Sequence, residues 1–178
     1  QLGYIIGKEN LFKTLQEYFN DWKFKHPGPN DFRRVAERVS GIQLQWYLTD
    51  WTQTTNVIDY KIEKVEGNST SAKVFLYRNG LMPMPLEILV KYNDGQYEMI
   101  YIPISLMRGE KKNPYNINWK VKPDWFWASP YYSFGLERGL DDIEAIVIDP
   151  SNLMADIDKT NNYYLAKMKK IENKELEK

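Results

Sequence analysis

Few residues in this chain can do chemistry, because its 178 residues include a single histidine, His26, and no cysteine. A zinc peptidase needs two imidazoles one helical turn apart, with a glutamate as general base, in a His-Glu-x-x-His motif. A serine triad also needs an imidazole, and His26 has no flanking nucleophile or acid pattern. Because His26 precedes Pro27 in an expected loop between helices, it is typical of a turn residue. The sequence therefore predicts no catalytic, cofactor-binding or metal-ligating residue.

Acidic residues offer a second kind of chemistry, because oxygen-rich loops ligate hard cations such as calcium. They gather in the last third of the chain: Asp141, Asp142, Asp149, Asp156 and Asp158. Their spacing lacks the register of an EF-hand, and Asp149 followed by Pro150 is typical of a turn that ends a strand. We expect the turn, and keep a structural cation as the alternative.

An aromatic loop is the best candidate for binding. Trp125, Phe126 and Trp127 follow one another between Pro123 and Pro130. Their flat faces could stack on sugar rings, which would make the chain a stand-alone carbohydrate-binding β-sandwich. The alternative is that alternate rings close the open end of a sandwich while the others contact a neighbouring domain. We favour this packing interpretation, because the flanking prolines indicate a rigid loop.

A charged run, Arg108 to Lys111, is typical of a solvated turn. Its functional alternative is docking, in which Arg108 pairs with a carboxylate on another domain. The candidate binding or docking surface therefore comprises Trp125, Phe126, Trp127 and Arg108.

Composition argues against several classes of partner. Lysine plus arginine and aspartate plus glutamate each number 24, so the net charge is zero. This balance gives no electrostatic basis for binding nucleic acid or an anionic membrane. No apolar run approaches the roughly 18 residues of a membrane span. A chain of this size can bury a core, because it hides about 70% of its unfolded surface.

A helical period marks the first part of the chain. Between Lys8 and Lys25 a wide apolar stripe predicts a core-facing helix. Its residues are Leu11, Phe12, Leu15, Tyr18, Phe19 and Trp22. Because the helices that follow are short, we expect part of this stripe to pack against a larger protein and to be exposed without it.

Two shorter helices are expected next. The first is capped at Asn30 or Asp31, after Pro29 ends the preceding loop, and it stops at Ser40-Gly41 because glycine readily takes the left-handed conformation. Its apolar face is formed by Phe32, Val35, Ala36 and Val39. The second spans about residues 43–51, and its apolar side is formed by Leu44, Tyr47, Leu48 and Trp51.

From Ile58 the apolar period becomes two, which predicts β-strands. They are expected near residues 58–65, 72–78, 86–92, 97–103, 117–122, 132–137 and 143–148. The link Asn93-Asp94-Gly95 predicts a tight hairpin, because its residues tolerate positive φ. Strands at this spacing are typical of an immunoglobulin-like sandwich.

The sequence thus predicts an α+β chain in three parts. Residues 1–55 form a short helical segment and residues 56–158 an immunoglobulin-like antiparallel β-sandwich. Residues 159–178 form a charged tail that is helical or disordered, because few apolar residues offset its ordering entropy. Since the sequence begins at Gln1 rather than at methionine, we expect a processed product or an excised part of a longer protein.

Motifs in residues 1 to about 55 resemble, in order and spacing, the end of the catalytic domain in the aminopeptidase N and leukotriene-hydrolase family of zinc metallopeptidases. They are Leu2-Gly3, Glu17 to Trp22, Lys23 to Pro27, Asp31-Phe32, Glu37, Ser40-Gly41, Leu44, Trp46-Tyr47 and Trp51. Residues 80–85, 107–110 and 148–150 resemble the β-rich domain that follows in bacterial members. The chain departs from its relatives at Gln43 and Gln45, where they often carry acids.

The resemblance implies that residues 1–55 are the last helices of a thermolysin-like catalytic domain. In such a parent protein, an upstream zinc ion activates the water that releases N-terminal residues from peptides, and a glutamate takes the proton. This chain lacks the zinc site, so it would be inactive alone and would act as a scaffold that braces the catalytic domain of the same polypeptide. The resemblance also implies a periplasmic or extracellular parent.

Overall fold

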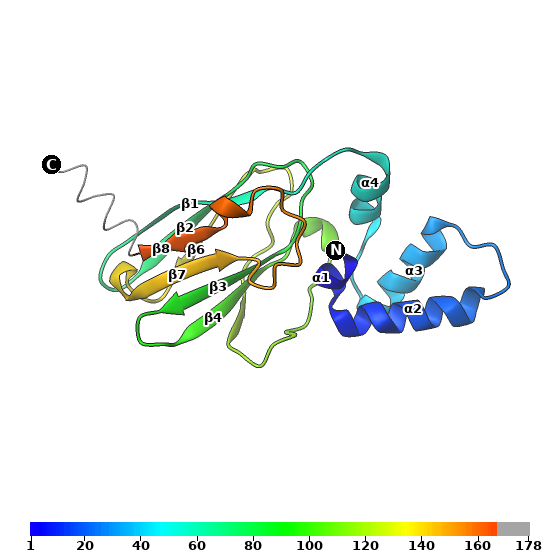
Figure 1. Ribbon diagram of the computed structural model, residues 1–178, viewed down its shortest axis with the longest axis horizontal. Helices are drawn as coiled ribbons and strands as arrows, with labels where there is room; N and C mark the ends of the chain where they lie inside the picture. Colours follow the sequence, from blue (N-terminus) through cyan, green and yellow to red (C-terminus); the bar gives the residue numbers. More distant parts are fainter. Residues whose placement is uncertain (167–178) are drawn as a thin grey trace.

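The computed structural model describes residues 1–166 and has two parts, a helical head and a β-sandwich (Figure 1). The head contains α1 (Leu2–Ile6), α2 (Lys8–Trp22), α3 (Pro29–Ser40) and α4 (Gln45–Gln53). These helices gather at one end of the sandwich in Figure 1, with α2 and α3 side by side. No helix within this described part is long and apolar enough to cross a membrane. The chain is α+β, as its sequence predicts.

Local hydrogen bonds define both ends of α3. Pro29 is the first residue of the helix, so the prediction that it belongs to the preceding loop is wrong. Gly28 N donates to Asp31 Oδ2 at 2.9 Å, which means that Asp31 caps the helix from inside its first turn. Gly41 ends the helix with a φ of 72°, and its N–H donates to Glu37 O. The predicted stop is therefore confirmed.

Two sheets form the sandwich. The smaller sheet is antiparallel and has the order β1 (Tyr60–Gly67), β2 (Ala72–Arg78) and β6 (Tyr131–Leu136). The larger sheet has the order β5 (Trp119–Val121), β4 (Tyr97–Ile102), β3 (Leu86–Tyr92), β7 (Ile143–Ile148) and β8 (Tyr163–Leu165). The β4–β5 pair is parallel, and the other pairs are antiparallel.

The connections between the sheets follow the immunoglobulin pattern. The chain crosses from the smaller sheet to the larger between β2 and β3, returns between β5 and β6, and crosses again between β6 and β7. Strands β1, β2 and β6 thus take the places of A, B and E, and β3, β7 and β8 those of C, F and G. The immunoglobulin-like sandwich predicted from the sequence is confirmed by this order.

The core lies between the sheets and follows the alternation of the strands. In β2, Val74 and Leu76 are buried while Lys73 is exposed. In β3 nearly every side chain is buried, because the strand is central in its sheet and the head covers part of it. Strands β3 and β4 form the predicted hairpin, and Gly95 supplies its positive φ of 81°.

All the predicted strands are present close to their expected positions, and one further strand was not predicted. Strand β8, Tyr163–Leu165, pairs with β7 inside the stretch for which we predicted helix or disorder. That prediction is wrong for these residues, because cross-strand pairing forms a strand too short to show a period of its own. The part of the predicted tail from residue 167 onward lies outside the described residues.

Helix α1 was also missed, and it seats the head on the sandwich. Tyr4, Ile5 and Ile6 are buried in the same core as the strands. Such a short apolar run shows no helical period, so its sequence gave no sign of a separate element. Its position next to the sandwich makes α1 the junction between the two parts (Figure 1).

A buried ion pair joins α1 to the sandwich. Lys111 pairs with Glu87 of β3, and their side chains are 5% and 1% exposed. Lys111 Nζ also donates to Tyr4 O at 2.6 Å and lies 4.8 Å from the centre of the Tyr4 ring. The second carboxylate oxygen of Glu87 accepts from the Tyr115 hydroxyl at 2.7 Å. The prediction of a solvated turn is wrong at Lys111, because protein groups replace its water.

A second contact fixes the head. Gln43 N donates to Met107 O at 2.8 Å, which joins the segment before α4 to the segment after β4. Nearby, the backbone at Gly109 lies against the end of α3, so that a Cβ there would stand 2.8 Å from Gly41 O. A side chain at Gly109 would therefore push the two segments apart. The head thus contacts the sandwich at Met107 and Gly109 as well as at Lys111.

Replacing Lys111 with methionine would leave Glu87 buried without its cation. We expect the free energy of unfolding to fall by about 3–5 kcal/mol in urea denaturation at neutral pH. The double variant Lys111→Met, Glu87→Met removes both charges and should recover part of the loss. The matched control is Lys64→Met, because Lys64 and Glu66 form an exposed pair that contributes little. Equal losses in the two lysine variants would contradict this account of the junction.

Candidate functional site

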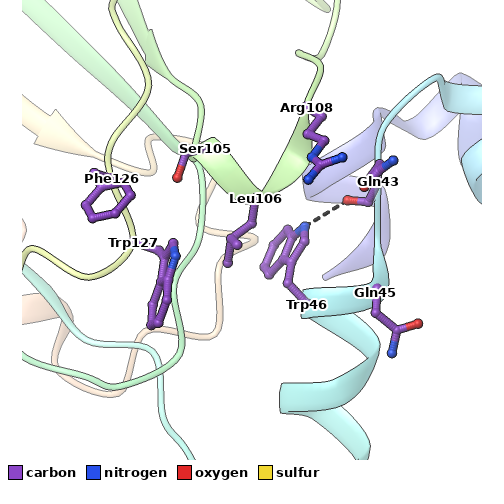
Figure 2. A pocket seen from close by; sticks show the side chains of 8 residues that line it. All are labelled: Gln43, Gln45, Trp46, Ser105, Leu106, Arg108, Phe126 and Trp127. Atoms are coloured by element: carbon purple, nitrogen blue, oxygen red, sulfur yellow. Dashed lines mark hydrogen bonds between the residues drawn. The ribbon is translucent and has the colours of Figure 1, made fainter.

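A cleft of about 510 Å³ lies between the head and the sandwich (Figure 2). One wall comes from the start of α4 and the residues before it, and the other from loops of the sandwich. The lining residues are Gln43, Gln45, Trp46, Ser105, Leu106, Arg108, Phe126 and Trp127. Three of the four residues predicted for binding or docking therefore meet in one place: Arg108, Phe126 and Trp127.

Backbone pairing positions the sandwich wall of the cleft. After β4 the chain enters a short 3-10 helix, η1 (Ser105–Met107), which runs beside the aromatic loop. Trp125 N donates to Pro103 O at 2.7 Å, and Ser105 N donates back to Trp125 O at 3.1 Å. These bonds hold the aromatic loop and η1 together, so the side chains that follow in each segment project into the same cleft.

Trp125, the fourth predicted residue, lies in the core rather than on the surface. Its side chain is 2% exposed, stacks on Tyr132 at 5.1 Å and meets Tyr60 edge-on at 5.5 Å. Its indole N–H donates to Ser129 O at 2.8 Å, which satisfies its polar atom. Trp125 thus packs at the end of the sandwich, as the packing interpretation expects, but the predicted alternation is wrong because Trp127, the alternate ring, is exposed.

Phe126 and Trp127 instead face solvent. They are 62% and 47% exposed, and their rings lie 6.5 Å apart at an angle of 43°. Figure 2 shows them on the sandwich side of the cleft, across Leu106 from Trp46. The two exposed rings are tilted to one another, so they do not form one flat platform.

Arg108 provides the charge of the cleft. It is exposed, takes a left-handed conformation with φ of 46°, and has no hydrogen bond or ion pair with another residue among 1–166. The other lining side chains are neutral, because Gln43 and Gln45 are amides. An unpaired guanidinium beside amides and aromatic rings suits a carboxylate partner with an apolar neighbour.

The opposite wall is held in place by a local bond. Trp46 Nε1 donates to Gln43 O at 2.8 Å, the dashed line in Figure 2. This bond keeps the Trp46 ring at the edge of the cleft, where it is mostly buried. The Ser105 hydroxyl on the sandwich wall is buried without a hydrogen-bond partner in the described structure. The cleft therefore presents one cation, Arg108, while the Ser105 hydroxyl lies buried behind its wall.

Helix α2 carries a second candidate surface. Phe12, Leu15 and Phe19, which we call the α2 stripe, are 60%, 46% and 65% exposed. On the other side of the helix, Leu11 packs against the core and Tyr18 meets Phe32 of α3 edge-on at 5.2 Å. The predicted core-facing helix thus has two apolar faces, and the rest of the described chain covers only one.

Metal-binding groups of the kind a peptidase uses are not found in the described part of the chain. Among residues 1–166, no three or more histidine, cysteine, aspartate and glutamate side chains are placed to hold a metal ion. His26 is exposed in the loop between α2 and α3. No protein-family model matches the chain, and a search of curated proteins finds no match.

The sequence did not identify most of the neutral residues that line the cleft: Trp46, Ser105 and Leu106 among them. Three segments far apart in the chain contribute to it, and only the folded junction brings them together. Gln43 and Gln45 line the opposite wall with amides. Acids there would neutralise Arg108, whereas amides leave its charge available.

The two tryptophans of the aromatic loop should respond differently to truncation. Trp125→Ala opens a cavity under Tyr60 and Tyr132, so we expect the free energy of unfolding to fall by about 3–5 kcal/mol. Trp127→Ala is the matched control and should change stability little, because that ring is half exposed. Urea denaturation followed by far-UV circular dichroism measures both. A larger loss for Trp127→Ala than for Trp125→Ala would refute the assignment.

Proposed function

We propose that this chain is the C-terminal, non-catalytic part of a zinc-dependent aminopeptidase and braces the catalytic domain of the same polypeptide. The observation that carries this proposal is the α2 stripe, an apolar face that the described residues leave uncovered. A contiguous exposed apolar face of this kind marks an interaction site. The motifs shared with the aminopeptidase N and leukotriene-hydrolase family indicate which kind of domain would cover it.

The chemistry of the surfaces supports a protein partner. Covering the α2 stripe would gain roughly 1 kcal/mol for each half-exposed side chain, and the lysines at its ends would keep their heads in water. Lys8 and Lys23 already lie over the rings of Phe12 and Phe19, at 5.8 and 6.0 Å. In the cleft, Arg108 would add a charge-assisted contact to a carboxylate of the partner.

The proposal assigns different roles to the catalytic domain and to the chain described here. In this proposal the upstream domain supplies the zinc ion, the general base and the grip on the free amine of the peptide. The chain described here supplies rigidity, because its head and sandwich are joined by a buried ion pair and by the contact at Gly109. It would contribute to catalysis by holding the catalytic domain in position.

The docking surface can be tested with the polypeptide encoded upstream of Gln1. We expect that polypeptide to carry a His-Glu-x-x-His motif and to bind this chain in trans. Phe12→Ser with Phe19→Ser should weaken binding at least about tenfold, because two anchors of the stripe are lost. The control is Phe126→Ser, which removes a similarly exposed ring outside the stripe. Binding that resists the double variant, in calorimetry, would refute the assignment of the stripe.

The isolated chain should not hydrolyse aminoacyl anilides when zinc is added, because its single histidine cannot build the required site. A chromogenic assay with and without a chelator measures this directly. Turnover that the chelator abolishes would show that the chain holds a catalytic metal of its own.

A second candidate function is binding of a carbohydrate at the aromatic loop, and the exposed rings of Phe126 and Trp127 favour it. We expect a sugar ligand to stack on Trp127 and to change tryptophan fluorescence during titration with oligosaccharides. Trp127→Ala should abolish the change, whereas Trp51→Ala, which removes an exposed ring on α4, should keep it. An unchanged spectrum in the unmodified chain would eliminate this candidate.

A further inference from the structure

Buried oxygen atoms without partners gather where the start of β1 meets the segment between β7 and β8. Asp59 and Asn162 are 4% and 3% exposed, and each has an Oδ1 atom with no hydrogen-bond partner. The Oδ1 atom of Asn161 is buried and unpartnered as well. All three atoms are acceptors, and a buried acceptor without a donor or a cation is costly. They therefore share a need for the same kind of partner.

Asp156 is hydrogen-bonded to residues of both segments. Its Oδ2 accepts from Tyr60 N at 3.0 Å and from Asn162 Nδ2 at 3.3 Å. Tyr60 follows Asp59 directly, and Ile58 on the other side of Asp59 forms a β-bridge with Asp156. The oxygen of Asn162 belongs to the same amide as the nitrogen that touches Asp156. The Asn162 amide thus lies against the Asp156 carboxylate, while the Asp59 carboxyl accepts from Asn79 Nδ2 through Oδ2 at 2.6 Å and keeps its Oδ1 without a partner.

In the surrounding turn, N–H groups donate hydrogen bonds to aspartate oxygens, whereas the amide oxygens of the two asparagines have no partner. Asp158 N donates to Asp156 Oδ1 at 3.0 Å, and Asn161 Nδ2 donates to Asp158 Oδ2 at 3.0 Å. The side-chain nitrogens of Asn161 and Asn162 therefore each donate to an aspartate, while their Oδ1 atoms have no hydrogen-bond partner. Lys159 is turned away, because its Nζ donates to Asn152 Oδ1.

The charges of Asp59 and Asp156 also favour a cation at this position. No lysine or arginine in the described chain forms an ion pair with Asp59 or Asp156. Burial, and more weakly the charge of Asp59, raises the pKa of the Asp156 carboxyl. Both carboxyl groups are buried and accept hydrogen bonds from amide nitrogens, those of Asn79 and Asn162, but they have no cationic side chain as a partner in the described chain. A cation or a proton is left to supply the positive charge.

We propose that Asp59, Asp156 and Asn162 bind a calcium ion that ties the β7–β8 segment to the start of β1. Calcium takes six to eight oxygen ligands in flexible geometry, so backbone carbonyls and water would complete its shell. Two carboxylates with amide oxygens suit this hard cation and do not suit zinc, which prefers nitrogen and sulfur ligands. The site belongs to the sandwich and is independent of the proposed function.

Such an ion would act on the fold rather than on a substrate. Asp59 precedes the small sheet at β1, whereas Asp156 and Asn162 lead into β8 of the larger sheet. A cation shared by these residues would link the two sheets at one edge of the sandwich. It would also order β8, the short strand that sequence reasoning did not identify.

Thermal unfolding of the whole chain tests the proposal. After treatment with a chelator, millimolar calcium should raise the midpoint by several degrees, because a ligand that binds only the folded state stabilises it. Magnesium should raise it less, since it demands a strict octahedron. Asp59→Asn should abolish the calcium response, and Asp124→Asn, which changes an exposed acid on another loop, should keep it.

A second measurement remains informative if Asp59→Asn does not fold. Terbium, which has the size and ligand preference of calcium, should bind the unmodified chain and luminesce on excitation of its aromatic residues, and calcium should displace it. Absence of both the calcium shift and the terbium signal would overturn the proposal. An equal response to magnesium would also overturn it, because that indicates screening of surface charge.

A shared proton is the competing explanation, and the same samples distinguish it. If Asp59 and Asp156 hold a proton instead of a cation, the folded state binds more protons than the unfolded state. Stability in the chelator would then rise as pH falls from neutral to about pH 5, and calcium would have no effect. That combination of results would overturn the calcium site.

Discussion

The buried pair of Lys111 and Glu87 is the contact on which the arrangement of this molecule depends. Removing two charges from water is costly, and the cost is met here by the Tyr4 carbonyl, the Tyr115 hydroxyl and the mutual attraction of the pair. These partners come from α1, from β3 and from the loop after η1, so they are satisfied together only when the head sits correctly on the sandwich. The pair therefore specifies one orientation of the head, and the walls of the cleft take their spacing from it.

A rigid junction explains how one small chain can present two different surfaces. The α2 stripe is apolar and belongs to a helix that protrudes from the sandwich, whereas the cleft has aromatic rings on both walls, Leu106 between them and one charged side chain, Arg108 (Figures 1 and 2). If the head swung freely, a partner that touched both surfaces would lose entropy on binding. With the head fixed, the two surfaces keep one position relative to each other.

The sequence predicted those features that arise from neighbouring residues. The change of period near Ile58 located the strands, and Asn93-Asp94-Gly95 located the hairpin, because both signals are local. It did not predict α1 or β8, which are too short to show a period and form by packing or pairing. Lys111 sits in a charged run that is typical of solvent, and only the fold brings Glu87 to it. The cleft was predicted in part, since Arg108 and the aromatic loop stood out while its neutral wall did not.

The lengths of the outer strands limit how copies of this molecule can meet. The larger sheet ends on both sides in strands of three residues, β5 and β8. An edge this short exposes few free backbone groups, so it is a poor template for recruiting another chain into a continuous ribbon. Amyloid-like growth and strand exchange are therefore disfavoured at both borders of the larger sheet. Any addition of a foreign strand is left to the smaller sheet, whose outer strands β1 and β6 have eight and six residues.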